Sequence, residues 1–201
     1  AIPSGNFGNA YSAWYGRFNG LPVNKILCST NVNDVLRRFI ETGELAPEKT
    51  LPSVAPSMDI QIPSSLERLI FDFTNGASAF YNSLLKENKA KLSEDNITQL
   101  NHIFSSTTFL DDDIKSEIKS LYKEFGSIFD PHSVTSIRMA LENQDAVPTV
   151  AVATASPEKF SNVIAPLIET FSEVAIDDKE EYLKLENDKF AISESIKAYF
   201  S

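Results

Sequence analysis

Five residues near the beginning of the sequence have the types and spacing of an anion-binding loop. Gly5, Asn6, Phe7, Gly8 and Asn9 stand directly before an amphipathic helical pattern. Glycine lets the backbone approach a ligand closely, and the first amide groups of a helix carry a partial positive charge. Together these features predict a phosphate-binding loop. Glycine and asparagine are also ordinary turn and cap residues, so a plain helix cap is the alternative.

Few other polar side chains stand where they could take part in chemistry. Ser57 and Asp59 lie in a long loop, where Asp59 either orients another residue or is simply exposed. His132 is either a base or phosphate ligand, or it makes a structural hydrogen bond at the start of a helix. Thr154 ends a predicted strand, and Ser156 is well suited to cap the helix that follows it. No metal site is predicted.

Hydrophobic periodicity predicts the elements around the first loop. Apolar side chains at helical spacing predict a buried helix over residues 7–18. Residues 25–30 are typical of a short inner strand, and residues 31–40 repeat the helical pattern with Asn31 as its cap. Residues 46–64 are rich in proline and have no helical period. We therefore predict a long irregular connection there, and such loops are often functional.

The middle of the sequence is predicted to be helical. One helix begins at Leu66, a second runs from a Ser93 cap to about Phe104, and a third begins at the aspartate run that starts with Asp111. Residues 75–127 are therefore predicted to form an all-helical excursion.

The last third of the sequence returns to mixed elements. Residues 130–143 predict a helix, and the apolar run 149–154 predicts a second inner strand. Residues 156–171 predict a helix that Pro166 kinks or splits. Residues 177–201 are acidic and then amphipathic, which is typical of a surface helix.

These elements predict a helix-rich α/β fold whose body consists of residues 1–74 and 128–201. The formal net charge of −10 argues against a nucleic-acid partner, because such affinity comes mainly from clustered Lys and Arg. Cys28 is the single cysteine of the sequence, which favours a reducing compartment and a cytoplasmic protein. No apolar run approaches the roughly 20 residues that span a bilayer, so no membrane partner is expected.

Five blocks of the sequence, in the same order, resemble the threonine synthase family. The blocks are IPSGNFGNA (2–10), LPVNKILCSTNVNDVLRRFIETGEL (21–45), SVAPSMDIQIPSSLERLIF (53–71), DPHSVTS (130–136) and VAVATASPEKF (150–160). The resemblance is weakest in the predicted helical excursion and in the acidic tail.

The resemblance implies the tryptophan-synthase-like fold (fold type II) of pyridoxal-phosphate enzymes, in which two α/β units hold the cofactor between them. It implies that the amides of residues 5–9 hold the phosphate of pyridoxal 5'-phosphate, and that the Thr154 hydroxyl bonds the pyridine nitrogen. It also places the block from Ser57 to Ile60 at the border of the active-site cleft, and the candidates for contact with the substrate are Ser57, Asp59, His132 and Ser156. Many relatives have a histidine where Ser156 stands.

The family's Schiff-base lysine belongs to an FKD-type motif well before the phosphate loop, and no such motif occurs here. The resemblance therefore implies the C-terminal half or so of a threonine synthase, which converts O-phospho-L-homoserine and water to L-threonine and phosphate. Without the N-terminal half, the chain is expected to be inactive. Two alternatives are a non-catalytic relative that keeps the cofactor or anion site, and an unrelated anion-binding α/β domain.

Overall fold

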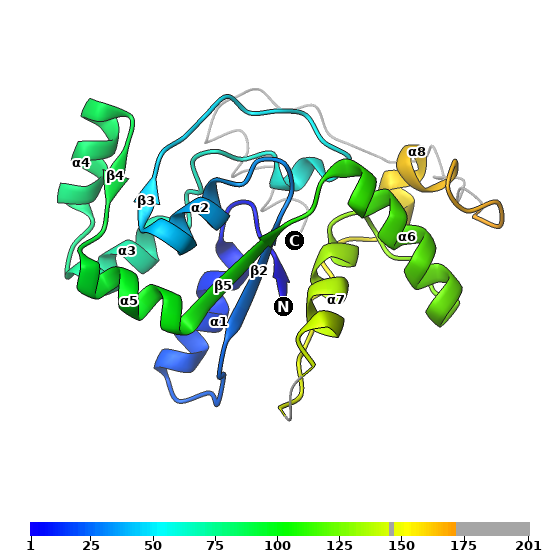
Figure 1. The fold of residues 1–201 in the computed structure, drawn as a ribbon, viewed down its shortest axis with the longest axis horizontal. Helices are drawn as coiled ribbons and strands as arrows, with labels where there is room; N and C mark the ends of the chain where they lie inside the picture. The colour runs from blue at the N-terminus through cyan, green and yellow to red at the C-terminus, as the bar shows by residue number, and fades with distance from the viewer. Residues whose placement is uncertain (145–146, 172–201) are drawn as a thin grey trace, which may run out of the picture.

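The structure, a computed structural model, describes residues 1–144 and 147–171 (Figure 1). The predicted tail helix over residues 177–201 lies outside these residues. In chain order the elements are β1 (Ile2–Pro3), α1 (Gly8–Phe18), β2 (Ile26–Thr30), α2 (Val35–Thr42), β3 (Glu44–Leu45), the 3-10 turn η1 (Pro56–Met58), α3 (Leu66–Thr74), α4 (Ser78–Glu87), β4 (Ala90–Lys91), α5 (Glu94–Ile103), β5 (Phe104–Thr108), α6 (Asp111–Phe125), α7 (Ser133–Glu142), the 3-10 turn η2 (Pro157–Phe160) and α8 (Ser161–Ile164).

The described part of the chain is built on a parallel sheet with the strand order β1-β2-β5. β2 is the central strand, and it pairs with β1 from Ile2↔Cys28 and with β5 from Ile26↔Phe104. All five residues of β2 are buried, which confirms the inner strand predicted over residues 25–30. β3 and β4 form a separate antiparallel pair.

Helices cover both faces of the sheet (Figure 1). Ile26 and Cys28 of β2 belong to a core shared with α1 to α5, whereas Leu27 belongs to a second core shared with α6, α7 and α8. This division follows from the alternation of side chains along a strand. The result is the helix-rich α/β arrangement that the sequence predicts, with one hydrophobic core on each face.

The segment 75–127 is not all-helical, so that part of the prediction is wrong. It contains β4 and also β5, which is paired with β2 over five residues. The sequence of β5 is FSSTT, and only Phe104 among its residues is buried. Because four of its five side chains are polar, the alternation of apolar residues that predicts a strand is absent here. The Ser93 cap of α5 is confirmed, since the Ser93 side chain accepts from the amide of Asn96 (3.4 Å).

The strand predicted over residues 149–154 is also wrong. These residues run beside β1 through two backbone hydrogen bonds, from Ala1 N to Val150 O (2.7 Å) and from Val152 N to Ala1 O (2.9 Å). The segment is exposed or half-buried, so it forms an extended edge and not an inner strand. The helix predicted over 156–171 is reduced to η2 and the single turn α8, which ends before Pro166 as the proline predicts.

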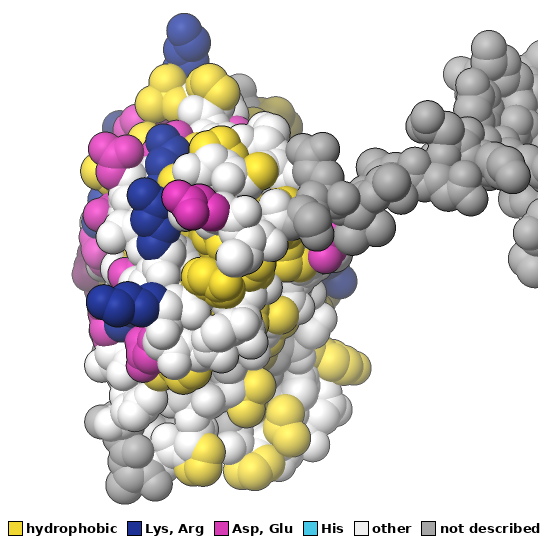
Figure 2. All heavy atoms as spheres, turned by 90° about the vertical axis from the view of Figure 1, so that its right-hand side faces the viewer, with side chains coloured by type: hydrophobic (Ala, Val, Ile, Leu, Met, Phe, Trp, Pro, Cys, Tyr) yellow, Lys and Arg dark blue, Asp and Glu magenta, His cyan; other side chains and the backbone are white. Residues whose placement is uncertain are grey.

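The burial predicted for residues 7–18 is only partly met, and aromatic side chains at the ends of both α1 and α6 are exposed. In α1, Trp14 is buried, but Phe18 is 70% exposed at the last turn. In α6, Phe125 is 49% exposed beside Gly126, which ends the helix with a left-handed φ of 67°. Figure 2 shows the face that carries α6 and α8, where basic and acidic side chains lie intermixed along one side and hydrophobic side chains are exposed elsewhere. Among residues 1–144 and 147–171, no helix is long and apolar enough to cross a membrane.

Candidate functional site

The loop between β1 and α1 presents a row of backbone amides. The strand pairing ends with Ser4 N donating to Ser29 O (2.8 Å), and α1 begins at Gly8. Within the described part of the chain, the amides of residues 5–10 have no hydrogen-bond acceptor. Phe7 adopts a left-handed conformation (φ 69°) while its ring is buried against Phe104. Successive amides in such a turn can form a concave anion site, to which Phe7 would contribute only its backbone.

Asn6 fastens this loop to the start of α3. Its side-chain Oδ1 accepts from Ser64 N (2.7 Å) and Ser64 Oγ (2.9 Å), and its carbonyl accepts from Ser65 N (3.1 Å). The Asn6 side chain therefore has a structural partner, and its amide is the group left for an anion. Asn9 is exposed in the first turn of α1.

The two glycines of the loop face different surroundings. A Cβ on Gly5 would lie 2.7 Å from Ser57 O and 2.8 Å from Met58 Cα, so the backbone of η1 requires glycine there. A Cβ on Gly8 would meet only Ser65 Oγ at 3.8 Å, which is ordinary contact. The protein itself therefore explains Gly5, whereas the space beside Gly8 is open.

The long loop that contains η1 closes over the carboxyl ends of the three parallel strands. Gly5 follows β1 and touches Ser57; Asn31 follows β2 and donates to Ala55 O (3.2 Å); Asp111 follows β5 and accepts from Val54 N (3.2 Å). The carboxyl edge of a parallel sheet is where open α/β folds bind ligands. The irregular connection predicted over residues 46–64 is confirmed, and it lies at this edge.

Asp59 orders that loop. Its Oδ1 accepts from Asn31 Nδ2 (2.6 Å), Asn33 Nδ2 (3.0 Å) and Ser53 Oγ (2.6 Å), and its Oδ2 accepts from Ser53 N (3.1 Å). Of the two predicted alternatives, the geometry favours a carboxylate that orients other residues. Asn31 is therefore not the cap of α2, which begins only after Asp34. Its buried amide is committed to the loop instead.

His132 is buried and both of its ring nitrogens are engaged. Nε2 accepts from Ser57 N (3.1 Å), and Nδ1 lies 2.8 Å from Asp130 Oδ1. Its ring also packs against Phe160, with 4.8 Å between the ring centroids. Of the two predicted roles, this geometry favours the structural hydrogen bond, because neither nitrogen is left for a phosphate or for proton transfer.

Asp130 is fully buried beside His132 at the start of α7. Burial alone would raise the pKa of Asp130, but hydrogen bonds from His132 and Ser133 to the carboxylate outweigh it and hold the pKa below its usual value. The carboxylate is therefore ionised at neutral pH. Sequence reasoning missed Asp130 and Ser133. The signal was available, since Asp followed by Pro131 directly before a helix is an N-cap pattern.

Thr154 and Ser156 occupy the extended segment and the turn after it. The amide of Thr154 donates to Ser133 Oγ (3.0 Å), and its own hydroxyl has no partner within the described residues. Ser156 precedes η2, as a cap would, but its hydroxyl bonds the Glu158 carboxylate and not a helix amide. Contacts thus join four predicted site residues in one series: Gly5 packs on Ser57, Ser57 bonds His132, and His132 is linked through Asp130 and Ser133 to Thr154. Ser156 stands outside this series.

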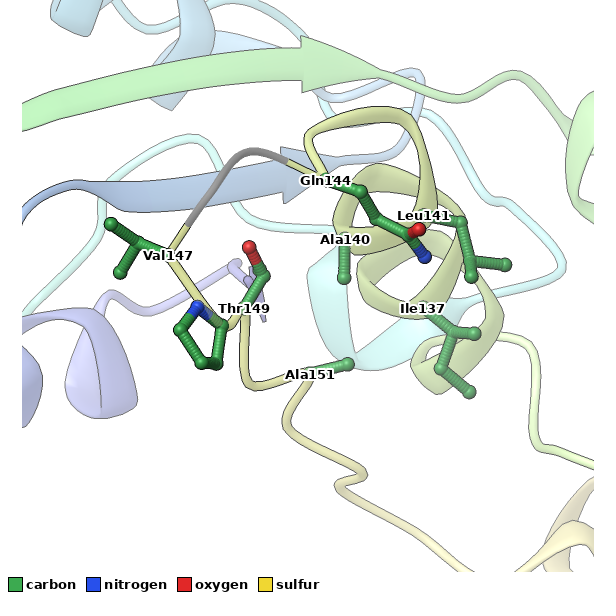
Figure 3. Close-up of a pocket in the computed structure, with 8 residues that line it drawn as sticks. Ile137, Ala140, Leu141, Gln144, Val147, Thr149 and Ala151 are labelled. Atoms are coloured by element: carbon green, nitrogen blue, oxygen red, sulfur yellow. The ribbon is translucent and has the colours of Figure 1, made fainter.

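Of two pockets in the described part of the chain, the second borders the loop of residues 5–9. One of about 440 Å³ lies between α7 and the segment after it, and its mostly apolar lining includes Ile137, Leu141 and Val147 but none of the predicted site residues (Figure 3). A second, of about 380 Å³, is lined in part by Ser64, the partner of Asn6, and by Arg68. The Arg68 guanidinium lies 4.8 Å above the Tyr11 ring. Among the described residues, no group of three or more side chains could hold a metal ion.

Known proteins share both the sequence and the fold of this chain. No family model matches it. It is 32% identical to threonine synthase from Pseudomonas aeruginosa, over 82% of this chain and 36% of that protein. It is 31% identical to threonine synthase-like 1 from Homo sapiens, over 81% of this chain and 23% of that protein.

Solved structures agree with the sequence relatives. The PLP-bound threonine synthase from Brucella melitensis superposes with a TM-score of 0.82 and 27% identity, covering 98% of this chain and 45% of that one. The yeast threonine synthase gives a TM-score of 0.78 and 26% identity, covering 89% and 40%. The chain spans less than half the length of each of these relatives. By sequence and by fold, it belongs to the threonine synthase family.

Proposed function

We propose that this chain contributes the phosphate-binding side of a pyridoxal 5'-phosphate site. The observation that carries the proposal is the row of amides at residues 5–10, which have no acceptor among the residues that the structure describes and lie at the start of α1 and at the carboxyl edge of the sheet. Backbone amides at a helix start bind phosphate without a basic side chain. The open space beside Gly8 fits such a ligand, and a structural relative is described as PLP-bound.

Thr154 is proposed to donate its hydroxyl to the pyridine nitrogen. The Ser133 side chain holds the Thr154 amide, so the position of the residue is fixed while its hydroxyl stays available. A neutral hydroxyl, unlike a carboxylate, does not require a protonated ring. When bound, the cofactor supplies an electron sink for chemistry at the carbons of an amino-acid substrate.

The reaction that we propose for the whole protein is the conversion of O-phospho-L-homoserine and water to L-threonine and phosphate. The Schiff-base lysine is proposed to come from the rest of the protein, because no FKD-type motif occurs in this sequence. The chain alone is then inactive and needs the lysine-bearing half as its partner. A cytoplasmic location fits a chain whose single cysteine, Cys28, is a buried thiol.

The test is carried out on the complete protein with Gly8→Val. The β-branched side chain would fill the space beside the loop amides, so we expect PLP affinity to fall at least tenfold and phosphate release to fall with it. Gly16→Val on the same helix is the matched control, because its Cβ meets only the Leu21 side chain (3.2 Å). Unchanged PLP affinity in Gly8→Val would show that the phosphate binds elsewhere.

The competing function is a relative that binds PLP or another anion without turnover. The absence of the lysine motif from this sequence is the observation that favours it. The same assay separates the two, because a complete protein that binds PLP but releases no phosphate from O-phospho-L-homoserine is a binding protein and not an enzyme.

A further inference from the structure

The carboxylate of Asp130 is the centre of a buried group of hydrogen bonds. Oδ1 lies 2.9 Å from His132 N, 2.8 Å from His132 Nδ1 and 3.4 Å from Ser133 N, and Oδ2 accepts from the Ser133 hydroxyl. All three side chains are buried, with exposed fractions of 0%, 2% and 1%. Bonds to a charged acceptor are stronger than neutral ones, so these contacts hold both side chains firmly.

One arm of this group reaches the loop under the proposed phosphate site. The Ser57 amide can only donate, so His132 Nε2 accepts and the ring proton is on Nδ1, where it donates to Asp130. The carboxylate thus selects the tautomer that can hold Ser57. Because Gly5 packs directly on Ser57 O, the position of the Ser57 backbone limits where the proposed phosphate loop can lie.

The other arm reaches the proposed partner of the ring nitrogen. Ser133 Oγ donates to Asp130 and accepts from Thr154 N (3.0 Å). An ordinary helix cap satisfies only amides in the first turn of its own helix. Here the two arms continue beyond α7 to two segments that lie far from it in the sequence.

We propose that Asp130 is a positioning residue that fixes Ser57 and Thr154 as one unit, and thereby sets the phosphate loop and the ring-nitrogen hydroxyl at the distance that one cofactor requires. This inference rests on the proposed function for the identity of the ligand. The coupling of the two amides through a single carboxylate stands on the contacts alone.

The decisive comparison is Ser133→Ala against Thr135→Val in the complete protein. Both remove a buried hydroxyl from the same turn of α7, but the Thr135 hydroxyl bonds Ser29 Oγ (2.7 Å) and His132 O (2.7 Å) and touches neither Asp130 nor Thr154. Ser133→Ala should speed hydrogen exchange of the Thr154 amide about tenfold and leave the Ser57 amide unchanged. Thr135→Val should change neither. Asp130→Ala should speed both amides.

Cofactor binding supplies the second measurement. Ser133→Ala should weaken PLP about tenfold and shift the absorbance of the bound cofactor, whereas Thr135→Val should do neither. Equal exchange of Thr154 in the two variants would overturn the inference, and so would faster exchange without any effect on PLP. If Asp130→Ala fails to fold, Asp130→Asn replaces it, because the amide keeps the shape of the side chain and removes the charge that holds both His132 and Ser133; both amides should again exchange faster. A wild-type protein that binds no PLP would refute the proposed function, while the exchange rates would still test the unit.

Discussion

The close contact between Gly5 and η1 predicts that a side chain at position 5 destabilises the protein. In Gly5→Ala, the new Cβ would lie 2.7 Å from Ser57 O and 2.8 Å from Met58 Cα. Ordinary contact needs roughly 3.5 Å or more, so the η1 backbone would have to retreat by about 0.8 Å. Both atoms belong to the backbone and not to a flexible side chain.

The size of the effect follows from how firmly η1 is held. Ser57 is fixed by His132, and the loop before it is fixed by Asp59, so the backbone cannot retreat without loosening buried hydrogen bonds. Overpacking of this kind costs about 1–3 kcal/mol, and we expect the upper end because two networks resist the movement. For a domain of this size, a loss of about 3 kcal/mol lowers the melting temperature by roughly 6–12 °C.

Chemical denaturation of Gly5→Ala and Gly8→Ala measures the difference. Gly8→Ala is the matched control, because its Cβ meets only Ser65 Oγ at 3.8 Å and alanine is the better helix former. Its free energy of unfolding should stay within about 0.5 kcal/mol of the wild type. Equal midpoints for the two variants would refute the close contact between the loop and η1, and with it the argument that Ser57 supports the loop.

Other predictions follow from single residues. Asp59→Ala should cost about 3 kcal/mol in denaturation experiments, since it removes four hydrogen bonds to one carboxylate and leaves the Ser53 amide without its acceptor, whereas the exposed Asp112→Ala should cost less than about 0.5 kcal/mol. The fold lowers the pKa of Asp130, so the ionised carboxylate stabilises the protein above the unfolded pKa of about 4, and this stabilisation is lost as the pH falls below that value. In Asp130→Asn, the free energy of unfolding should therefore fall less steeply with decreasing pH than in the wild type. Burial raises the pKa of Cys28 to about 12, so iodoacetamide at pH 8 should label this thiol only after unfolding.

The sequence predicted those elements whose apolar side chains repeat with a clear period. α2, α6 and α7 lie where periodicity places them, and Ser93 caps α5 as its side chain predicts. Periodicity does not reveal β5 because this edge strand has the sequence FSSTT, and its Ser and Thr side chains lie beside neighbouring hydroxyl and carbonyl groups. For example, Ser106 Oγ donates to Cys28 O (2.6 Å). Strand formation there depends on pairing with β2, which no local pattern reports.

The sequence predicts the loop of the candidate site, but it does not predict the long-range hydrogen bonds that hold the segments around that loop. Glycines before a helix are a local signal, so residues 5–9 could be found from the sequence. An asparagine before a helix usually caps it, so the sequence predicts Asn31 as a cap, but its partners Ser53 and Asp59 lie 22 and 28 residues away. Long-range hydrogen bonds of this kind leave no periodic trace. The same holds for the contact of His132 with Ser57, at a separation of 75 residues.

The charge of the chain is consistent with this way of binding an anion. A protein with a formal net charge of −10 has no general attraction for phosphate, so the attraction has to be local. Two acidic groups that hold segments beside the proposed site, Asp59 and Asp130, are both committed to hydrogen bonds within the protein. The hydrogen-bond donors around each carboxylate offset its negative charge. Each carboxylate also accepts from a backbone amide, Asp59 from Ser53 N and Asp130 from His132 N. In the proposed site these carboxylates act indirectly, because they fix the η1 loop on which Gly5 packs.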